Sequence, residues 1–310
     1  SAFGGAGVLA ACGSAVFLHE GAKLGVSGPK VLETLLGSNH FDAGDAPGVA
    51  RLFGAAARIA SGLAQTLPGD MLRARDILAQ VLRQRRPLAE ALDATQVDLA
   101  ARLAAAGHAP ARAEASWTLA AAATPCDALG WLWRLGADEV YVLRAVAPAA
   151  LGPERAFALG LALRNFARQA PAGATLFVLE DSAGHEASLE AEALGLTHFL
   201  AWLALCHAEV RARGVSTIGL LTGNGISAAF FANALQAEVL FALPEARVKL
   251  MEARAMERVT GLSRSEIESL LENDPVFGQP ARHLRTWKAL AGELDRLDAQ
   301  ALTDLAAAMS

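Results

Sequence analysis

Two short segments of the chain combine a glycine-rich turn with the start of a helix made of small residues. The first covers residues 1–7 (SAFGGAG) and the second covers residues 222–229 (TGNGISAA). The start of a helix leaves backbone N–H groups without partners and carries a partial positive charge, so it stabilises an oxyanion or a phosphate. Small side chains also let a ligand approach the backbone closely. Because the two segments share one design, we expect two related sites.

The second segment is compatible with more than one chemistry. Gly223, Gly225 and Ala228 have the spacing of a dinucleotide-binding fingerprint, but no acidic residue ends the next expected strand to hold a ribose. In an oxyanion hole, by contrast, the backbone N–H groups of the first helical turn would stabilise developing negative charge. The glycines and alanines would also suit a purely structural role, in which they let the helix pack tightly on a sheet.

A serine nucleophile is a further interpretation of the same turn. Residues 225–229 (GISAA) approach the GxSxG elbow of hydrolases, although alanine replaces the last glycine. Ser227 would then be the nucleophile, with His185 or His207 as its base. The histidines show no metal-ligand spacing, so no metal site is expected.

The second half of the chain alternates short apolar runs with segments of helical periodicity. Strands are expected at residues 139–146, 174–179, 215–221 and 238–242, and helices at 153–169, 189–213, 227–236 and from 263 onward. Strands joined by helices form a mostly parallel sheet, so the pattern predicts an α/β fold. Both predicted turns then lie where a helix begins.

The first hundred residues lack this regular alternation of strands and helices. Helices are expected from about residue 5 and at residues 51–67 and 77–92. The segment 107–112 (GHAPAR) is rich in Ala, Arg and Pro, and we place a linker or domain boundary there. The chain therefore divides into residues 1–110 and 111–310.

The composition excludes several classes of protein. The 310 residues contain 27 Lys and Arg against 32 Asp and Glu, and this balance offers no electrostatic footprint for nucleic acid. Three widely separated cysteines have neither disulfide nor zinc-ligand spacing, so we expect a reducing cytoplasm. No targeting signal is evident. The uncharged residues 214–237 are long enough to cross a bilayer, but their asparagines and central glycines predict a buried strand and helix.

Two ordered sets of residues resemble a known family. The first set comprises Phe3-Gly4-Gly5, residues 24–33 (LGVSGPKVLE), Phe41-Asp42, Asp45, Arg51 and Arg58. The second comprises Asp181, His185, Glu192, Gly195, residues 225–230 (GISAAF), Ala242-Leu243-Pro244, Met251 and residues 256–260 (MERVT). In this order they resemble the beta and gamma subunits of malonate decarboxylase, relatives of the carboxyltransferase subunits of biotin-dependent carboxylases.

The resemblance implies a crotonase-like fold, a β-β-α superhelix with two related halves. Residues 1–110 would be the C-terminal part of a beta-subunit-like domain, and residues 111–310 a gamma-subunit-like domain. Because the chain opens at the first turn itself, we expect it to be a fragment of a beta–gamma fusion. Crotonase-like proteins often associate through their helices, so an oligomer is also implied.

The resemblance also implies an activity and its partners. Such proteins bind a malonyl thioester on a phosphopantetheine-type arm and release CO2, forming the acetyl thioester through an enolate. The arm would be carried by a partner acyl carrier protein, within a complex of other decarboxylase subunits, and this chain would need no cofactor of its own. Backbone N–H donors would stabilise the enolate oxygen.

Site residues carried over from the family lie at both turns. The amides of Gly4 and Gly5 would form the first oxyanion hole, and those of Ala228 and Ala229 the second. Alanine at positions 228 and 229, where relatives usually have glycine, keeps the N–H group but narrows the space for a thioester. The resemblance gives Ser227 and His185 secondary catalytic roles. His185 would act as a hydrogen-bonding group, because relatives often have Gln there. Substrate contacts would come from Phe3, Gly225 and Ile226.

Two alternatives remain beside the decarboxylase. The chain could be a carboxyltransferase subunit that hands CO2 to biotin, which would arrive on a separate carrier because the chain has no biotinyl-lysine motif. It could also be a non-catalytic scaffold that only docks a partner subunit.

Overall fold

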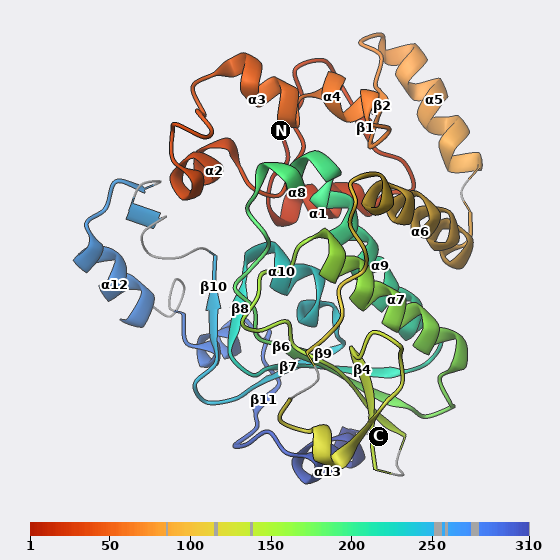
Figure 1. The fold of residues 1–310 in the computed structure, drawn as a ribbon, viewed down its shortest axis with the longest axis vertical. Helices are drawn as coiled ribbons and strands as arrows, with labels where there is room; N and C mark the ends of the chain where they lie inside the picture. The colour runs from red at the N-terminus through yellow and green to blue at the C-terminus, as the bar shows by residue number, and fades with distance from the viewer. Residues whose placement is uncertain are drawn as a thin grey trace.

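A central β-sheet organises the C-terminal two thirds of the chain. The computed structural model describes residues 1–309 except 85, 115–116, 137–138, 251–255, 258–259 and 274–278. Met251, Arg258 and Val259 of the second family set therefore lie outside the described residues. Among the described residues, seven strands form the sheet in the order β11-β9-β7-β6-β5-β4-β3 (Figure 1). They are β3 (Ala123–Pro125), β4 (Leu132–Leu135), β5 (Val140–Leu143), β6 (Thr175–Glu180), β7 (Ser216–Leu221), β9 (Val239–Ala242) and β11 (Gly292–Glu293).

The sheet is parallel from β5 to β11 and is buried on both faces. Only β3 and β4 add to it in antiparallel fashion among the described strands. Leu176 and Val178 of β6 point to the core beneath α7 (Pro153–Gln169) and α9 (Leu196–Ala212), whereas Phe177 points to the opposite core beneath α13 (Ala299–Met309). This alternation is the period of a strand, and it confirms the predicted α/β fold.

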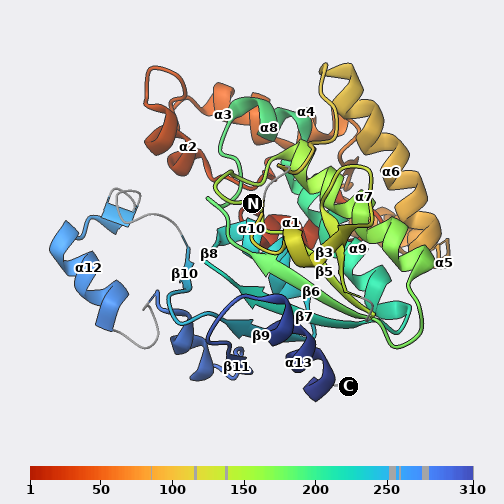
Figure 2. The same cartoon turned by 60° about the horizontal axis from the view of Figure 1, so that its bottom comes forward.

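A second, smaller layer of strands produces a strand-strand-helix repeat. After β7 the chain forms β8 (Asn224–Ile226) and then α10 (Ser227–Ala232), and after β9 it forms β10 (Arg247–Lys249). β8 and β10 pair in parallel with each other, outside the main sheet (Figure 2). The β-β-α arrangement that the family resemblance implies is thus present at the second turn.

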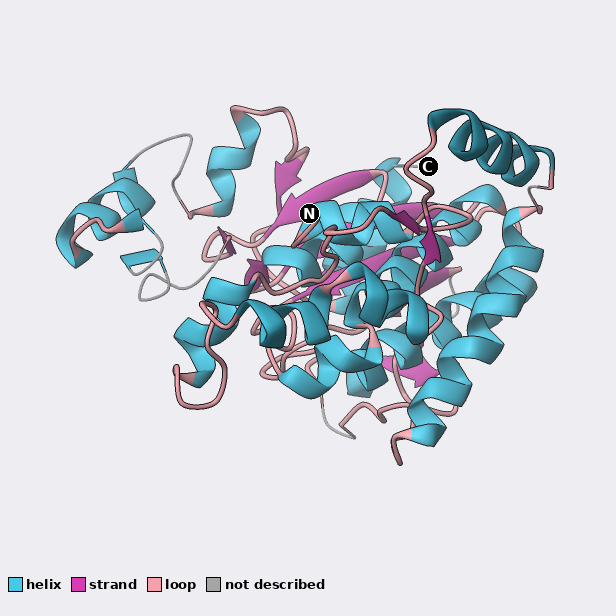
Figure 3. Cartoon of the chain, turned by 90° about the horizontal axis from the view of Figure 1, so that it is seen from above, coloured by secondary structure: helices cyan, strands magenta, loops and turns pink. Residues whose placement is uncertain are grey.

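The first 105 residues are mainly helical in the described structure. Their elements are α1 (Gly5–Ala11), β1 (Phe17–Leu18), α2 (Pro29–Leu36), α3 (Ala46–Phe53), α4 (Ala55–Ala60), β2 (Gln65–Thr66), α5 (Met71–Arg83) and α6 (Leu88–Ala105). Helix α1 packs on α9 and α10, and α6 packs on α7 and α9. Figure 3 shows helices gathered around the strands. The N-terminal helices therefore cover the same helical layer that covers the sheet.

The segment predicted as a linker is held to the rest of the chain. His108 lies between two carboxylates, with Nδ1 2.8 Å from Glu154 and Nε2 2.9 Å from Glu190. The hydrogen bond to Glu190 raises the pKa of His108. The amide of Ala111 donates to the Glu154 carbonyl. Residues 107–112 thus run along the starts of α7 and α8 (Leu189–Leu194).

Several helix boundaries differ from the sequence prediction. The expected helix at residues 77–92 is wrong, because α5 ends at Arg83 and α6 starts after Pro87. The expected long helix at 189–213 is two helices, since Gly195 has a φ of 90°, which suits glycine and ends α8. By contrast, α7 coincides with the expected helix at 153–169, and the four expected strands are confirmed to within a few residues.

The uncharged residues 214–237 form β7, β8 and α10, as the sequence predicts. Among the described residues, no helix combines the length and apolar character that a bilayer span requires.

Candidate active site

A hydrogen bond within the protein holds the first turn, and its donor is one of the two amides predicted to stabilise the oxyanion. Gly4 is the N-cap of α1 and has a φ of 58°, a conformation that favours glycine. Its N–H donates to the carbonyl of Val26 at 2.8 Å. The Gly4 amide, predicted as an oxyanion donor, is therefore already engaged within the protein. The amides of Gly5 and Ala6 come next, in the first helical turn, where no intrahelical acceptor exists.

Phe3, predicted to contact substrate, contributes to a small N-terminal core. Its ring packs edge-on against Phe53, with 5.4 Å between the ring centroids. Phe53 in turn packs edge-on against Phe41. Phe3 itself is only partly buried, so this packing fixes the entry to α1 and leaves part of the ring accessible.

The second turn makes an equally sharp change of direction. Strand β8 ends at Ile226, and Ser227 then has a φ of 51°, an uncommon value for a residue with a side chain. Such outliers persist only where the surrounding structure enforces them, and they cluster at functional sites. Ala228 and Ala229 follow in the first turn of α10 and are 1% and 0% exposed. Their amides lie at the N-terminal end of this helix.

The structure packs the helix that follows the first turn against the helix that follows the second. Helix α1 packs against α10, and a Cβ built on Gly5 would lie 3.8 Å from the ring of Phe231. Phe231 is one helical turn beyond Ser227, about 6 Å along the axis. The start of α1 therefore lies beside the short helix that the second turn begins.

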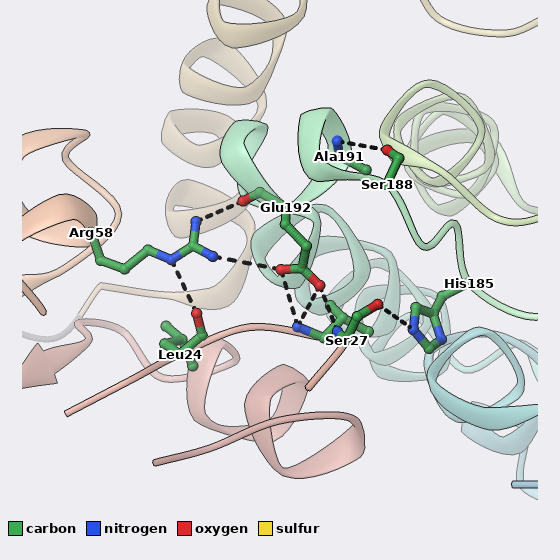
Figure 4. A network of polar contacts seen from close by, with 8 residues as sticks. Leu24, Ser27, Arg58, His185, Ser188, Ala191 and Glu192 are labelled. Carbon is green, nitrogen blue, oxygen red and sulfur yellow. Dashed lines mark hydrogen bonds and ion pairs between the residues drawn. The ribbon is translucent and has the colours of Figure 1, made fainter. Parts of the chain in front are cut away.

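A buried carboxylate holds the backbone next to the first turn (Figure 4). Glu192 of α8 accepts hydrogen bonds from the amides of Val26, at 3.0 Å, and Ser27, at 2.5 Å. Arg58 of α4 donates from Nη1 to the Glu192 carbonyl at 2.7 Å and from Nε to the Leu24 carbonyl at 3.0 Å. Its Nη2 lies 3.5 Å from the Glu192 carboxylate. One acid and one base thus fix the course of residues 24–27.

Both charged groups of this network are shielded from solvent. The side chains of Glu192 and Arg58 are 0% and 3% exposed. Burial raises the pKa of Glu192, while the amides of Ser27 and Val26 and the guanidinium of Arg58 act in the opposite direction. Burial likewise lowers the pKa of Arg58, and Glu192 opposes this shift. Each group therefore depends on the other, because an unpaired buried charge is strongly unfavourable.

His185 joins this network from the loop that follows β6. Its Nε2 lies 3.1 Å from the hydroxyl of Ser27. Its Nδ1 is buried and has no hydrogen-bond partner among the described residues. Burial lowers the pKa of His185 to about 4. The imidazole is therefore neutral near pH 7, which suits hydrogen bonding rather than proton donation by an imidazolium.

The loop between β6 and α8 contacts the second turn and the segment beside the first. At its start, Asp181 accepts from the amide of Asn224 at 2.9 Å, and the amide of Ser182 donates to the Asn224 carbonyl at 3.0 Å. Further along, His185 reaches Ser27, whose neighbour Val26 bonds to Gly4. The loop is therefore linked to the first turn through residues 26 and 27.

The serine-hydrolase interpretation lacks a base. His185 is hydrogen-bonded to Ser27, and His207, which is fully buried, is 3.1 Å from the side-chain oxygen of Asn233. Neither imidazole is paired with Ser227 among the described residues. The Ser227 side chain therefore has no activating partner there.

Other candidate sites are few within the described residues. No group of three histidine, cysteine or acidic side chains could hold a metal there. An open pocket of about 350 Å³ lies between α3 and α8, lined by Phe41, Asp42, Asp45, Arg51 and Leu189 among others. Its lining includes none of the predicted site residues.

Sequence reasoning did not assign a site role to Ser27, Arg58 or Glu192. All three belong to the two sets of residues that carry the family resemblance. Their connection was hidden because more than 130 residues separate either N-terminal residue from Glu192. The signal available was the presence of an arginine and a glutamate within apolar helical stretches.

Strands β7 and β8 and helix α10, with the small-residue turn at the helix start, follow the strand-strand-helix order of a crotonase-like α/β fold. The sequence model of the malonate decarboxylase gamma subunit matches residues 147–309, more than half of the chain. The chain therefore belongs to the malonate decarboxylase gamma-subunit family, which confirms the predicted resemblance for this part.

Solved structures give further similarities. A Pseudomonas malonate decarboxylase hetero-tetramer in complex with coenzyme A is 25% identical over 68% of this chain and 84% of its own, with a TM-score of 0.49. Transcarboxylase 12S is 15% identical over 99% of this chain and 62% of its own, with a TM-score of 0.45. An enoyl-CoA hydratase from Bacillus halodurans is 14% identical over 56% and 75%, with a TM-score of 0.34. No curated protein sequence matches the chain.

Proposed function

We propose that this chain takes part in the decarboxylation of a malonyl thioester to the acetyl thioester. Membership of the malonate decarboxylase gamma-subunit family is the observation that carries the proposal. The packing of α1, which begins at the first turn, against α10, which begins at the second, supports it. The acyl group would be attached to a phosphopantetheine arm on an acyl carrier protein. The reaction would take place in the cytoplasm, where the free cysteines stay reduced.

The chemistry requires stabilisation of one developing charge. The bond between the carboxylate carbon and the α-carbon breaks, its electron pair moves into the thioester, and CO2 leaves. The resulting enolate oxygen accepts hydrogen bonds, and a proton from solvent then adds to the α-carbon. A preorganised N–H donor contributes about 3 to 4 kcal/mol to such a step. Gly5 supplies that donor at the first turn, with Gly4 as its structural support.

The remaining predicted residues have supporting roles in this proposal. Ala228 and Ala229 offer a second pair of amides, whose methyl groups restrict the acyl group that fits. His185 donates or accepts a hydrogen bond as a neutral imidazole. Ser227, Gly225 and Ile226 shape the second turn.

A scaffold role is the second candidate, and one observation favours it. The amide of Gly4 is engaged by Val26, which leaves the first turn with fewer free donors than an oxyanion hole of two adjacent glycine amides would have. A scaffold would bind partner subunits without turning over substrate.

Release of CO2 tests the proposal directly. Malonyl-coenzyme A and a malonyl carrier protein are supplied to the chain alone and to the chain assembled with its partner subunits. We expect CO2 release from the assembly that is unaffected by avidin. Loss of activity with avidin would favour the biotin-dependent carboxyltransferase, and thioester binding without CO2 release in any assembly would favour the scaffold.

A further inference from the structure

The dipeptide formed by Val26 and Ser27 lies where three separate contacts meet. The Val26 carbonyl accepts the amide of Gly4 at 2.8 Å. The Val26 and Ser27 amides both donate to the Glu192 carboxylate. The Ser27 hydroxyl contacts Nε2 of His185 (Figure 4). The first turn, the buried acid and the loop histidine are therefore joined through two consecutive residues.

Val26 and Ser27 belong to neither a strand nor a helix, so no regular backbone hydrogen bonds hold them. Residues 26 and 27 form a bend between an isolated bridge at Leu24 and the start of α2. Val26 and Ser27 are 2% and 1% exposed, so their amides would be unsatisfied without the carboxylate. A carboxylate that accepts two adjacent amides fixes the orientation of both peptide planes.

We propose that Glu192 and Ser27 are positioning residues for the reaction at the first turn. Glu192 holds the backbone of Val26, whose carbonyl holds Gly4 and so orients the amide of Gly5. The Ser27 hydroxyl fixes the ring of His185. This inference rests on the proposed function and names two residues that serve it without touching the substrate.

The chain contains a matched control for the buried ion pair. Arg164 of α7 and Glu209 of α9 are 1% and 5% exposed, with Nε 2.9 Å from the carboxylate. Arg164 also reaches Gln96 and Asp93 of α6. Like the Arg58–Glu192 pair, it ties an N-terminal helix to the C-terminal part of the chain, but it does so between α6, α7 and α9.

The first experiment compares Glu192→Gln with Glu209→Gln in the full chain assembled with its partner subunits. Glutamine keeps the shape and one acceptor but removes the charge, so we expect the two variants to lose similar thermal stability. With malonyl-coenzyme A as substrate, kcat of Glu192→Gln should fall by roughly tenfold to a hundredfold, as a slight misplacement of donors produces. Its KM should stay nearly unchanged, and Glu209→Gln should keep the wild-type kcat. Equal kcat values for the two variants at matched folded concentration would overturn the role of Glu192.

The second experiment needs no turnover. Ring-nitrogen NMR signals of His185, assigned by their loss in His185→Gln, report its tautomer and hydrogen bonding. Ser27→Ala should move these signals, whereas Thr95→Val, which removes a hydroxyl bonded to a helix carbonyl in α6, should not. Unchanged His185 signals in Ser27→Ala would overturn the role of Ser27. A wild-type assembly that releases no CO2 would contradict the proposed function, while the NMR signals would still decide whether Ser27 fixes His185.

Discussion

Each of the two turns contains a residue with a positive φ, but the residue type and its support differ. At the first turn a glycine, Gly4, has the positive φ, and at the second turn a serine, Ser227, has it. The first turn is secured from outside by the buried Glu192 through Val26. The second is secured by Asp181, which is only partly buried. The comparison indicates that a buried carboxylate supports the first turn, whereas a partly exposed one supports the second.

Removal of one amide from each turn tests which of them stabilises the enolate. We expect Gly5→Pro, which deletes an N–H donor at a helix position that accepts proline, to lower kcat by about a hundredfold to a thousandfold. Ala228→Pro at the second turn should lower it far less, because the neighbouring methyl groups already restrict that space. The measurement is kcat for CO2 release from malonyl-coenzyme A, with circular dichroism as a check on folding. A larger loss from Ala228→Pro would reverse the assignment of the two turns.

Removal of the acidic residue that supports each turn should also lower the free energy of unfolding by different amounts. Glu192→Ala leaves the buried Arg58 without its counterion and two amides without their acceptor, so we expect a loss of about 3 to 5 kcal/mol in the free energy of unfolding. Asp181→Ala removes one acceptor from the Asn224 amide at a partly exposed site, for a loss of about 1 kcal/mol. Urea denaturation measures both, and Asp181→Asn, which retains an acceptor, serves as the control. Equal losses would contradict the difference in support between the turns.

The pH dependence of stability reports the burial of His185 beside the first turn. Its pKa is about 4 in the folded chain against the usual 6.5. As the pH falls from 6.5 to 4, the unfolded chain takes up a proton that the folded chain does not, so stability declines over this range. His185→Gln should make that decline smaller by about 3 kcal/mol.

A second buried histidine provides the control for this measurement. Burial also lowers the pKa of His207 to about 4, so His207→Gln should reduce the acid decline by a similar amount. At pH 7 neither glutamine variant should lower kcat strongly, whereas His185→Ala, which removes the hydrogen-bonding group beside Ser27, should lower it. If the stability of His185→Gln declined with acid as much as that of the wild type, the pKa of His185 would not be lowered in the folded chain.

The strands of the sheet and the two turns could be predicted from the sequence, but the contacts between them could not. Short continuous apolar runs predicted β5, β6, β7 and β9, because burial of a strand on both faces leaves such a run. The glycine-rich turns were visible because backbone geometry demands particular residue types. The bond from Gly4 to Val26 and the pairing of Ser27 with His185 were not, since tertiary packing alone brings such distant segments together.

The smallest expected effect concerns the methyl groups of the second turn. Ala229 is fully buried in the first turn of α10, so Ala229→Gly removes a methyl group that faces the packed interior near the proposed acyl site. We expect a loss of about 1 kcal/mol in the free energy of unfolding, from helix propensity, and an unchanged kcat for malonyl-coenzyme A. Turnover of the bulkier methylmalonyl-coenzyme A should rise relative to malonyl-coenzyme A, measured as the ratio of kcat/KM values.

An alanine in the first turn of α1 provides the control for this selectivity. Ala6 is exposed, so Ala6→Gly carries a similar propensity cost but opens no space in the packed interior. It should leave the ratio of kcat/KM values unchanged. A ratio unaffected by Ala229→Gly would mean that the second turn does not contact the acyl group, and the first turn would then account for substrate selection alone.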